Sequence, residues 1–387
     1  MKKTNKIAEL EILRAFAFLA VVLQHAIGHY AYAPGTTLAD GVMLGGLLLL
    51  AKFAVPIFIF ISGMVLCYRY KTEPVPLFPF LRKRIKDIFL PYLPWAVLYA
   101  SIEGDHLISP LKHMSDMGTK LFTGTASYHL WYVIMTFQFY LLFPLLHGIV
   151  LKVNQRLTAS GWGWTLLGLG LLYIGLTGQV SLIGHWTEGI PGVGDFFGEY
   201  SDRNVLYFFY YFVLGAFAGL HLERFKSLLL RYKQVLIGLF VVLLLWTWYR
   251  IVEHFQTVPE LQIQYNDTLL IQPKMAIVLI ASIPAMYLAA IFFTERASAA
   301  LQRFMSIIGS YSYVAYLAHA LMLVAATLIA DDFLFFMNPT LRTLAAFAIC
   351  SALSVAAAAA IRRLSASARR ILSRTNSNAP MGKTESR

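Results

Sequence analysis

The sequence predicts an all-α, polytopic integral membrane protein with about ten transmembrane helices and both termini cytoplasmic. Three observations predict this fold class: the apolar composition, the length of the apolar segments and the placement of the cations. Of the 387 residues, 58% are hydrophobic and 13% are charged, whereas charged residues approach a quarter of an ordinary soluble domain. A soluble protein of this composition would expose large apolar patches and aggregate, so lipid is the expected solvent.

The apolar segments have lengths that suit a bilayer, because roughly 18 or more apolar residues cross it as a helix. The third segment is short and contains Pro91 and Pro94, so its limits stay open. The first also resembles a signal peptide, but Glu11 and Arg14 beside its apolar core favour an uncleaved span. The spans are predicted at residues 10–30, 43–68, 87–103, 128–150, 161–183, 204–222, 235–253, 273–293, 305–330 and 341–361.

The cations favour one orientation. If the N-terminus is cytoplasmic, most of the 32 Lys and Arg residues fall in inner segments, while the outer segments are acidic or mixed, as in most membrane proteins. The chain then divides into a cytoplasmic segment at 1–9, a transmembrane domain at 10–361 and a basic, disordered cytoplasmic tail at 362–387. The same clustering accounts for the net charge of +12 without nucleic acid, since no basic stripe alternates with base-stacking aromatic residues.

Several kinds of site find no support in the sequence. The two cysteines, Cys67 and Cys350, fall in predicted spans and lack C-x-x-C spacing, so we expect no disulfide and no metal site. The sequence also has no Gly-rich P-loop, no H-E-x-x-H motif and no G-x-S-x-G motif. Kinase, ATPase, zinc-protease and serine-hydrolase interpretations therefore have no basis.

Ionisable residues inside spans are the most informative ones, because their burial in hydrocarbon is costly. Arg14 and His25 lie eleven residues apart in the first span, which places them on one helix face about 16 Å apart along the axis. Arg14 could snorkel to headgroups, and His25 could be a packing residue. A cation and a titratable base on one face nevertheless favour a functional pair, in which the histidine accepts and returns a proton.

Two further histidines are candidates. His319 falls in the ninth span at a depth expected to match that of His25, with Ser312 on the same face; the alternative is a hydrogen-bonding cluster between helices. His129 and Trp131 open the fourth span, either within an interfacial aromatic belt or as the rim of an acceptor site.

Two groups of cations need an explanation as well. Lys52, in the second span, requires an acidic partner or a wet cavity, unless that span begins later. The inner segment from Phe80 to Asp87 contains Arg82, Arg84 and Lys86. It is either a topology determinant that contacts anionic lipids or a phosphate site for a nucleotide-like donor.

These residues resemble the membrane-bound acyltransferase family 3, whose members acylate cell-surface carbohydrates in bacteria. Arg14 and His25 look like the family's Arg-x10-His signature. Where family loops often show Arg-x-x-Arg, this chain has Arg84 followed by Asp87, with Lys86 adjacent, so the second arginine of such a clamp is replaced. The resemblance covers about residues 8–361, and its other landmarks are Val55 to Gly63, Phe80 to Tyr92, His129 to Tyr132 and Gly309 to His319.

The resemblance implies a membrane acyltransferase of the bacterial plasma membrane. It would move an acyl group, expected to be acetyl, from acyl-CoA on the cytoplasmic side to a sugar hydroxyl of a lipid-linked or exported glycan, with no tightly bound cofactor. By this resemblance His25 and Arg14 would be catalytic and Arg84, Lys86 and Arg82 would bind the donor. The acceptor-binding or supporting residues would be His129, Trp131, His319 and Ser312.

Two other functions fit a chain with buried ionisable residues. The first is a transporter or flippase for polysaccharide precursors or acyl groups, which paired repeats with broken helices would favour; the sequence shows no clear internal repeat. The second is a non-catalytic scaffold in a polysaccharide synthase complex, for which an Arg14–His25 pair would be unnecessary.

Overall fold

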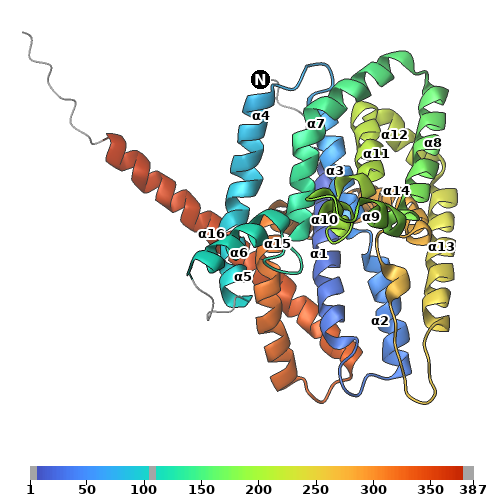
Figure 1. Ribbon diagram of the computed structural model, residues 1–387, viewed down its shortest axis with the longest axis vertical. Coiled ribbons are helices and arrows are strands. Elements are labelled where there is room, and N and C mark those ends of the chain that lie inside the picture. Colours follow the sequence, from blue (N-terminus) through green and yellow to red (C-terminus); the bar gives the residue numbers. More distant parts are fainter. Residues whose placement is uncertain (1–6, 104–109, 378–387) are drawn as a thin grey trace, which may run out of the picture.

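The computed structural model describes residues 7–103 and 110–377. In these residues every secondary-structure element longer than an isolated β-bridge is a helix (Figure 1). The predicted all-α fold class is therefore confirmed. The helices are α1 (Ala8–Tyr30), α2 (Leu38–Ala51), α3 (Ala54–Arg69), α4 (Leu77–Arg84), a π-helical turn (Ile85–Phe89), α5 (Leu90–Glu103), α6 (Pro110–Thr123), α7 (Trp131–Arg156), α8 (Ala159–Thr177), α9 (Val180–Thr187), α10 (Val193–Phe197), α11 (Phe209–Leu220), α12 (Leu222–Arg231), α13 (Lys233–Glu253), α14 (Pro273–Arg296), α15 (Ala299–Phe333) and α16 (Pro339–Ser377).

Within the described residues, 7 helical segments are long and apolar enough to cross a membrane, namely α1, α2 with α3, α7, α13, α14, α15 and α16. An eighth is obtained if α8 and α9 count as one span despite a bend of 62° between them. The two other predicted spans contain α5 and α11, which are shorter helices. The protein is thus a multi-pass membrane protein, whereas the number ten and the cytoplasmic placement of both termini stay predictions.

Helix α1 lies in the middle of the bundle (Figure 1) and packs against α2, α3, α14, α15 and α16. Its buried side chains, such as Leu13, Phe18 and Val22, are distributed around the helix, as expected for a helix with neighbours on several sides. Its start is held by an ion pair of 2.6 Å between Glu9 and Lys226 of α12. Side chains on more than one face of α1 are therefore available to line an interior site.

The second span is broken at Lys52 and Phe53, between α2 and α3. It begins at Leu38, earlier than predicted, because Thr37 and Asp40 form a capping box that starts α2. At the break, Nε2 of Gln24 in α1 donates a hydrogen bond of 2.9 Å to the carbonyl oxygen of Ala51. This bond satisfies one of the carbonyls that the end of α2 leaves without an intrahelical partner.

Two predicted boundaries differ from the structure. The basic segment from Phe80 to Asp87, expected as a loop, is helical, because α4 and the π-helical turn run directly into α5. Helix α16 continues to Ser377 and projects away from the bundle (Figure 1), so residues 362–377 of the predicted disordered tail are helical. Ala, Arg and Leu, which are frequent in this stretch, are strong helix formers. Residues 378–387 lie outside the described residues.

Helices α3 and α11 approach so closely that only glycine fits at the contact. A Cβ on Gly215 would lie 2.1 Å from the carbonyl oxygen of Phe60, and one on Gly219 would lie 2.3 Å from that of Met64. This is the small-xxx-small pattern by which helices pack in lipid. Helix α3 also carries Ser62, which lines the cavity described below.

We therefore expect Gly215→Leu to lower the free energy of unfolding by about 1–3 kcal/mol, because overpacking forces the two backbones apart. Gly238→Leu in α13 is the matched control, since a Cβ there meets nothing within 4 Å. Thermal unfolding of both variants in the same detergent measures the difference. Equal stability of the two variants would contradict the close α3–α11 contact.

Candidate active site

Three histidines from distant parts of the chain meet inside the bundle. The ring centroid of His319 in α15 lies 5.2 Å from that of His25 in α1 and 4.6 Å from that of His129, just before α7. His129 and His319 are buried, whereas His25 keeps part of its surface accessible. We call these residues the histidine cluster, and His25 is its member best placed to meet a small molecule.

The hydrogen bonds of the cluster fix the state of one ring. Nδ1 of His319 faces the carbonyl oxygen of Tyr316, and since a carbonyl can only accept, Nδ1 carries a hydrogen. When the ring is neutral, Nε2 is therefore a bare acceptor, and in the described part of the chain this atom has no hydrogen-bond partner. The Tyr316 hydroxyl donates to the carbonyl of His129, which ties the start of α7 to α15.

A cavity of about 290 Å³ with two arginines lies next to this cluster. Arg14 and Arg84 both line it, no acidic residue does, and neither arginine has an ion pair among the described residues. The Arg84 guanidinium lies over the rings of Phe80 and Tyr140, 5.1 and 5.0 Å from their centroids, which holds it in place by cation–π attraction. We call this space the arginine cavity; its charge and hydrogen-bond donors suit a phosphate or another anion.

Two tyrosines connect the arginine cavity to the histidine cluster. Tyr132 and Tyr316 line the cavity, with ring centroids 5.7 Å apart. The Tyr316 ring is also 5.4 Å from His319 and 5.5 Å from His129. Ser312, two turns before His319 on α15, lines the cavity as well. The histidines do not line the cavity themselves; Tyr316 is the lining residue whose ring lies beside His319 and His129.

The distance between Arg14 and His25 follows from the geometry of α1. Arg14 and His25 lie on this single helix, so they are separated by about 16 Å along its axis. The close contact of α1 with α15 at Gly309 sets the register of the two helices, because a Cβ on Gly309 would lie 2.0 Å from the carbonyl oxygen of Glu11. The predicted arrangement of a cation and a histidine at different depths is thus present in the structure.

The other predicted site residues lie at varying distances from this space. Trp131 packs its ring against Phe208, 6.0 Å away, and does not line the cavity. Arg82 is exposed on α4, and Lys86 lines a separate groove. Lys52 stands at the break between α2 and α3 and interacts electrostatically with His25. An acidic partner for Lys52, one of the alternatives weighed for it, is not found among the described residues.

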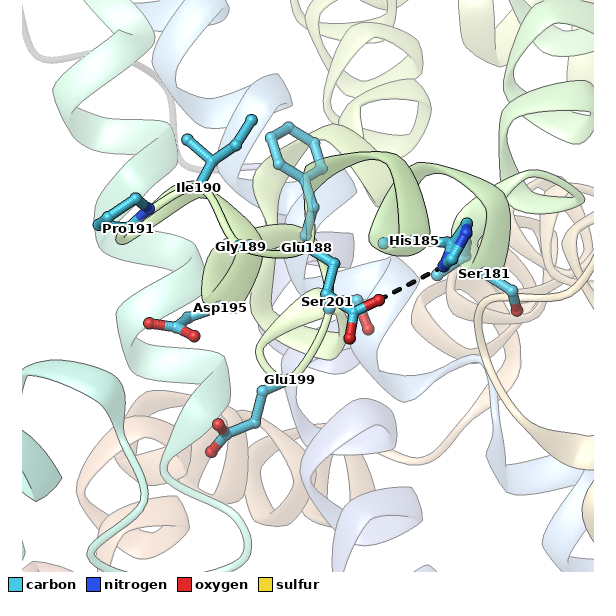
Figure 2. A pocket seen from close by; sticks show the side chains of 14 residues that line it. Ser181, His185, Glu188, Gly189, Ile190, Pro191, Asp195, Glu199 and Ser201 are labelled. Atoms are coloured by element: carbon cyan, nitrogen blue, oxygen red, sulfur yellow. Dashed lines mark ion pairs between the residues drawn. The ribbon is translucent and has the colours of Figure 1, made fainter.

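A second hollow, of about 670 Å³, lies around α9 and α10. Figure 2 shows its acidic side chains Glu188, Asp195 and Glu199, and the ion pair of 3.3 Å between His185 and Glu188. Its residues are largely exposed. An anionic donor would be repelled by these carboxylates, so the arginine cavity suits it better. Among the side chains that the structure describes, no group of three or more His, Cys, Asp or Glu could hold a metal ion, in either place or elsewhere.

All five sequence landmarks contribute to the arginine cavity: the first supplies Arg14, the second Ser62, the third Arg84, the fourth Tyr132 and the fifth Ser312. A family model described as an acyltransferase domain, that of acyltransferase family 3, matches residues 7–363. The chain belongs to acyltransferase family 3. It is therefore a membrane acyltransferase by family, as the resemblance implied.

Two curated proteins are similar to parts of this acyltransferase. It is 26% identical over 249 residues to YfiQ of Bacillus subtilis (strain 168), described as a membrane-bound acyltransferase, covering 60% of this chain and 62% of that one. It is 24% identical over 251 residues to a protein of Staphylococcus aureus (strain MRSA252) described as a poly-beta-1,6-N-acetyl-D-glucosamine export protein, covering 62% of this chain and 64% of that one. The chain thus spans less than two thirds of the length of either relative. No solved structure matches it.

The tyrosines of the site were not among the site residues predicted from the sequence. Tyr132, Tyr140, Tyr313 and Tyr316 line the arginine cavity, and Tyr128 lies beside His25 with ring centroids 4.7 Å apart. The chain contains 21 tyrosines, so no single tyrosine stands out in the sequence as a site residue. Their spacing could have helped, since Tyr313 and Tyr316 are three residues apart and share a helix face with Ser312 and His319.

Proposed function

We propose that this acyltransferase moves an acyl group, and specifically acetyl, from acyl-CoA on the cytoplasmic side to a sugar hydroxyl of a lipid-linked or exported cell-surface glycan, in a bacterial plasma membrane. The observation that carries the proposal is the arginine cavity lying directly against the histidine cluster. An anion-binding site and a neighbouring proton acceptor are the two parts that this reaction needs. Family membership adds the reaction type.

The donor would bind through its phosphates. Acyl-CoA is a polyanion, and Arg14 and Arg84 offer guanidinium donors without a competing carboxylate on the cavity wall. A volume of about 290 Å³ suits the narrow arm and the acyl group of the donor rather than the whole nucleotide. The phosphates next to this arm would lie at the arginines, with the adenosine left at the mouth of the cavity. The thioester would then point past Tyr132 and Tyr316 toward His25.

The histidines would move the proton. His25 takes the hydrogen of the sugar hydroxyl as the oxygen attacks the thioester carbonyl, so that a C–O bond forms and the C–S bond breaks. The imidazolium then returns the proton to the departing thiolate. In the alternative route, His25 itself carries the acyl group between two such steps. In both routes His319 and His129 support the His25 ring, and Tyr316 keeps His319 in one tautomer.

The acceptor would approach from the side of Tyr128. This ring is 54% exposed and its centroid is 4.7 Å from that of His25, so it offers an aromatic face next to the proposed base. Aromatic faces suit the apolar side of a sugar ring. The name of the Staphylococcus aureus relative, which concerns a polysaccharide, supports a glycan as acceptor.

The second candidate function is transport of a polysaccharide precursor, which the export role in that same name favours. The two functions are separated by acetyl-CoA labelled with ¹⁴C in the acetyl group and ³H in the coenzyme. Purified protein in nanodiscs receives this donor with a panel of lipid-linked glycans. We expect ¹⁴C to enter the glycan while ³H stays with free coenzyme A. If no acceptor in a panel that contains the native glycan gains ¹⁴C, the transport function is favoured instead.

A further inference from the structure

A long groove on the side of the bundle lies outside the proposed reaction site. It has a volume of about 1100 Å³ and runs between α5, α15 and α16. Part of its lining is apolar, with Pro94 and Leu98 from α5 and Val314 from α15, and the rest is polar or charged. Leu98 is 40% exposed, so the groove is open to the surroundings of the bundle, which for a membrane protein is lipid.

Two cations line this groove. Lys86 reaches it from the π-helical turn and Arg362 from α16. The groove also contains Asp87, but its carboxylate is paired with Lys83 at 2.7 Å. The Arg362 guanidinium lies over the Tyr311 ring, 5.3 Å from the centroid. Since neither Lys86 nor Arg362 has an ion pair among the described residues, both charges remain available to a ligand.

A groove that combines an apolar stretch with two available cations matches an amphiphile with an anionic head. We propose that the groove binds an anionic glycerophospholipid, with its phosphate between Lys86 and Arg362 and one acyl chain along Pro94, Leu98 and Val314. Charge complementarity selects an anionic head over a zwitterionic one, because both cations attract a head that carries a net negative charge.

The groove shares a wall with the arginine cavity but is distinct from it. Ser310 and Tyr313 line both spaces, and the Tyr313 hydroxyl donates a hydrogen bond of 2.6 Å to the carbonyl of Ile88. This bond closes the wall between α15 and the π-helical turn. A lipid in the groove would pack against the outer side of that wall. This site goes beyond the proposed function and does not depend on it.

Native mass spectrometry of the purified protein, titrated with phosphatidylglycerol or phosphatidylcholine, measures the binding. We expect phosphatidylglycerol to bind more tightly, and the double variant Lys86→Gln with Arg362→Gln to bind it at least about tenfold more weakly, since two charges of about 1 kcal/mol each are lost. The matched control is Arg82→Gln with Arg363→Gln, which removes two exposed charges outside the groove lining, one from α4 next to the π-helical turn and one from α16. This control should bind phosphatidylglycerol like the wild type.

A third variant tests the apolar part of the groove. Leu98→Trp places a larger side chain at an exposed position, so folding should persist while binding of both lipids falls. Equal affinity of the wild type for the two lipids would overturn the proposal. So would equal losses in the groove variant and its control, which would show a general charge effect. Preference for a polyprenyl phosphate over phosphatidylglycerol would also overturn it, because a different lipid would then occupy the groove.

Discussion

Replacement of His25 by alanine should lower kcat for acyl transfer by about 10²–10⁴-fold, the usual contribution of a positioned general base. KM for acyl-CoA should change little, because His25 lies about 16 Å along α1 from Arg14, at the other end of the proposed path. Steady-state rates of the purified variant, with acyl-CoA and glycan varied separately, give both constants.

His29→Ala is the matched control for this prediction. His29 lies on α1 one turn beyond His25, has a side chain that is 47% exposed, and faces Asp331 at 3.6 Å rather than the histidine cluster. Its loss should leave kcat nearly unchanged. Equal losses of kcat in the two variants would indicate damage to α1 as a whole, and an unchanged kcat in His25→Ala would remove His25 from the chemistry.

Replacement of Arg14 or Arg84 by glutamine should weaken donor binding by about 10–100-fold, since a charge-assisted hydrogen bond contributes about 1.5–3 kcal/mol. The expected sign is a raised Kd for acyl-CoA, measured by calorimetry or by protection of the protein against heat. Lysine at either position should restore binding only in part. It keeps the charge but lacks the planar fork of the guanidinium.

Arg82→Gln provides the comparison for the donor site. Arg82 belongs to the same basic segment as Arg84, yet it is exposed and does not line the arginine cavity. If the cavity binds the donor, this variant should bind acyl-CoA almost as the wild type does. A larger effect from Arg82 than from Arg84 would place the donor phosphates outside the cavity.

Much of the site could be predicted because it consists of ionisable residues, which are rare inside apolar segments since their burial in hydrocarbon is costly. Arg14, His25 and His319 stand out in apolar segments, and helix geometry alone put Arg14 and His25 on one face. That His25 and His319 meet depends on the contact of α1 with α15, which a single sequence does not specify. The tyrosines could not be predicted as site residues, because tyrosine is also common at membrane interfaces and in protein cores.

The span count is where length-based prediction was least informative. The segments at 87–103 and 204–222 are apolar, but they contain the shorter helices α5 and α11. Helix α11 packs through Gly215 and Gly219 against α3. Apolar composition does not distinguish a short helix that packs against its neighbours from one that crosses the bilayer alone, and neither the break at Lys52 nor the bend between α8 and α9 leaves a strong sequence signal.

We propose that an acyl group passes from a cytoplasmic donor through the arginine cavity to the histidine cluster. Acyl transfer in oriented membrane vesicles tests this most directly. Doubly labelled acetyl-CoA is added to the outside of inside-out and of right-side-out vesicles that contain the protein and its glycan. We expect acetyl label to enter glycan only in inside-out vesicles, and not with His25→Ala. Transfer only in right-side-out vesicles, or equal transfer by His25→Ala, would contradict this proposal.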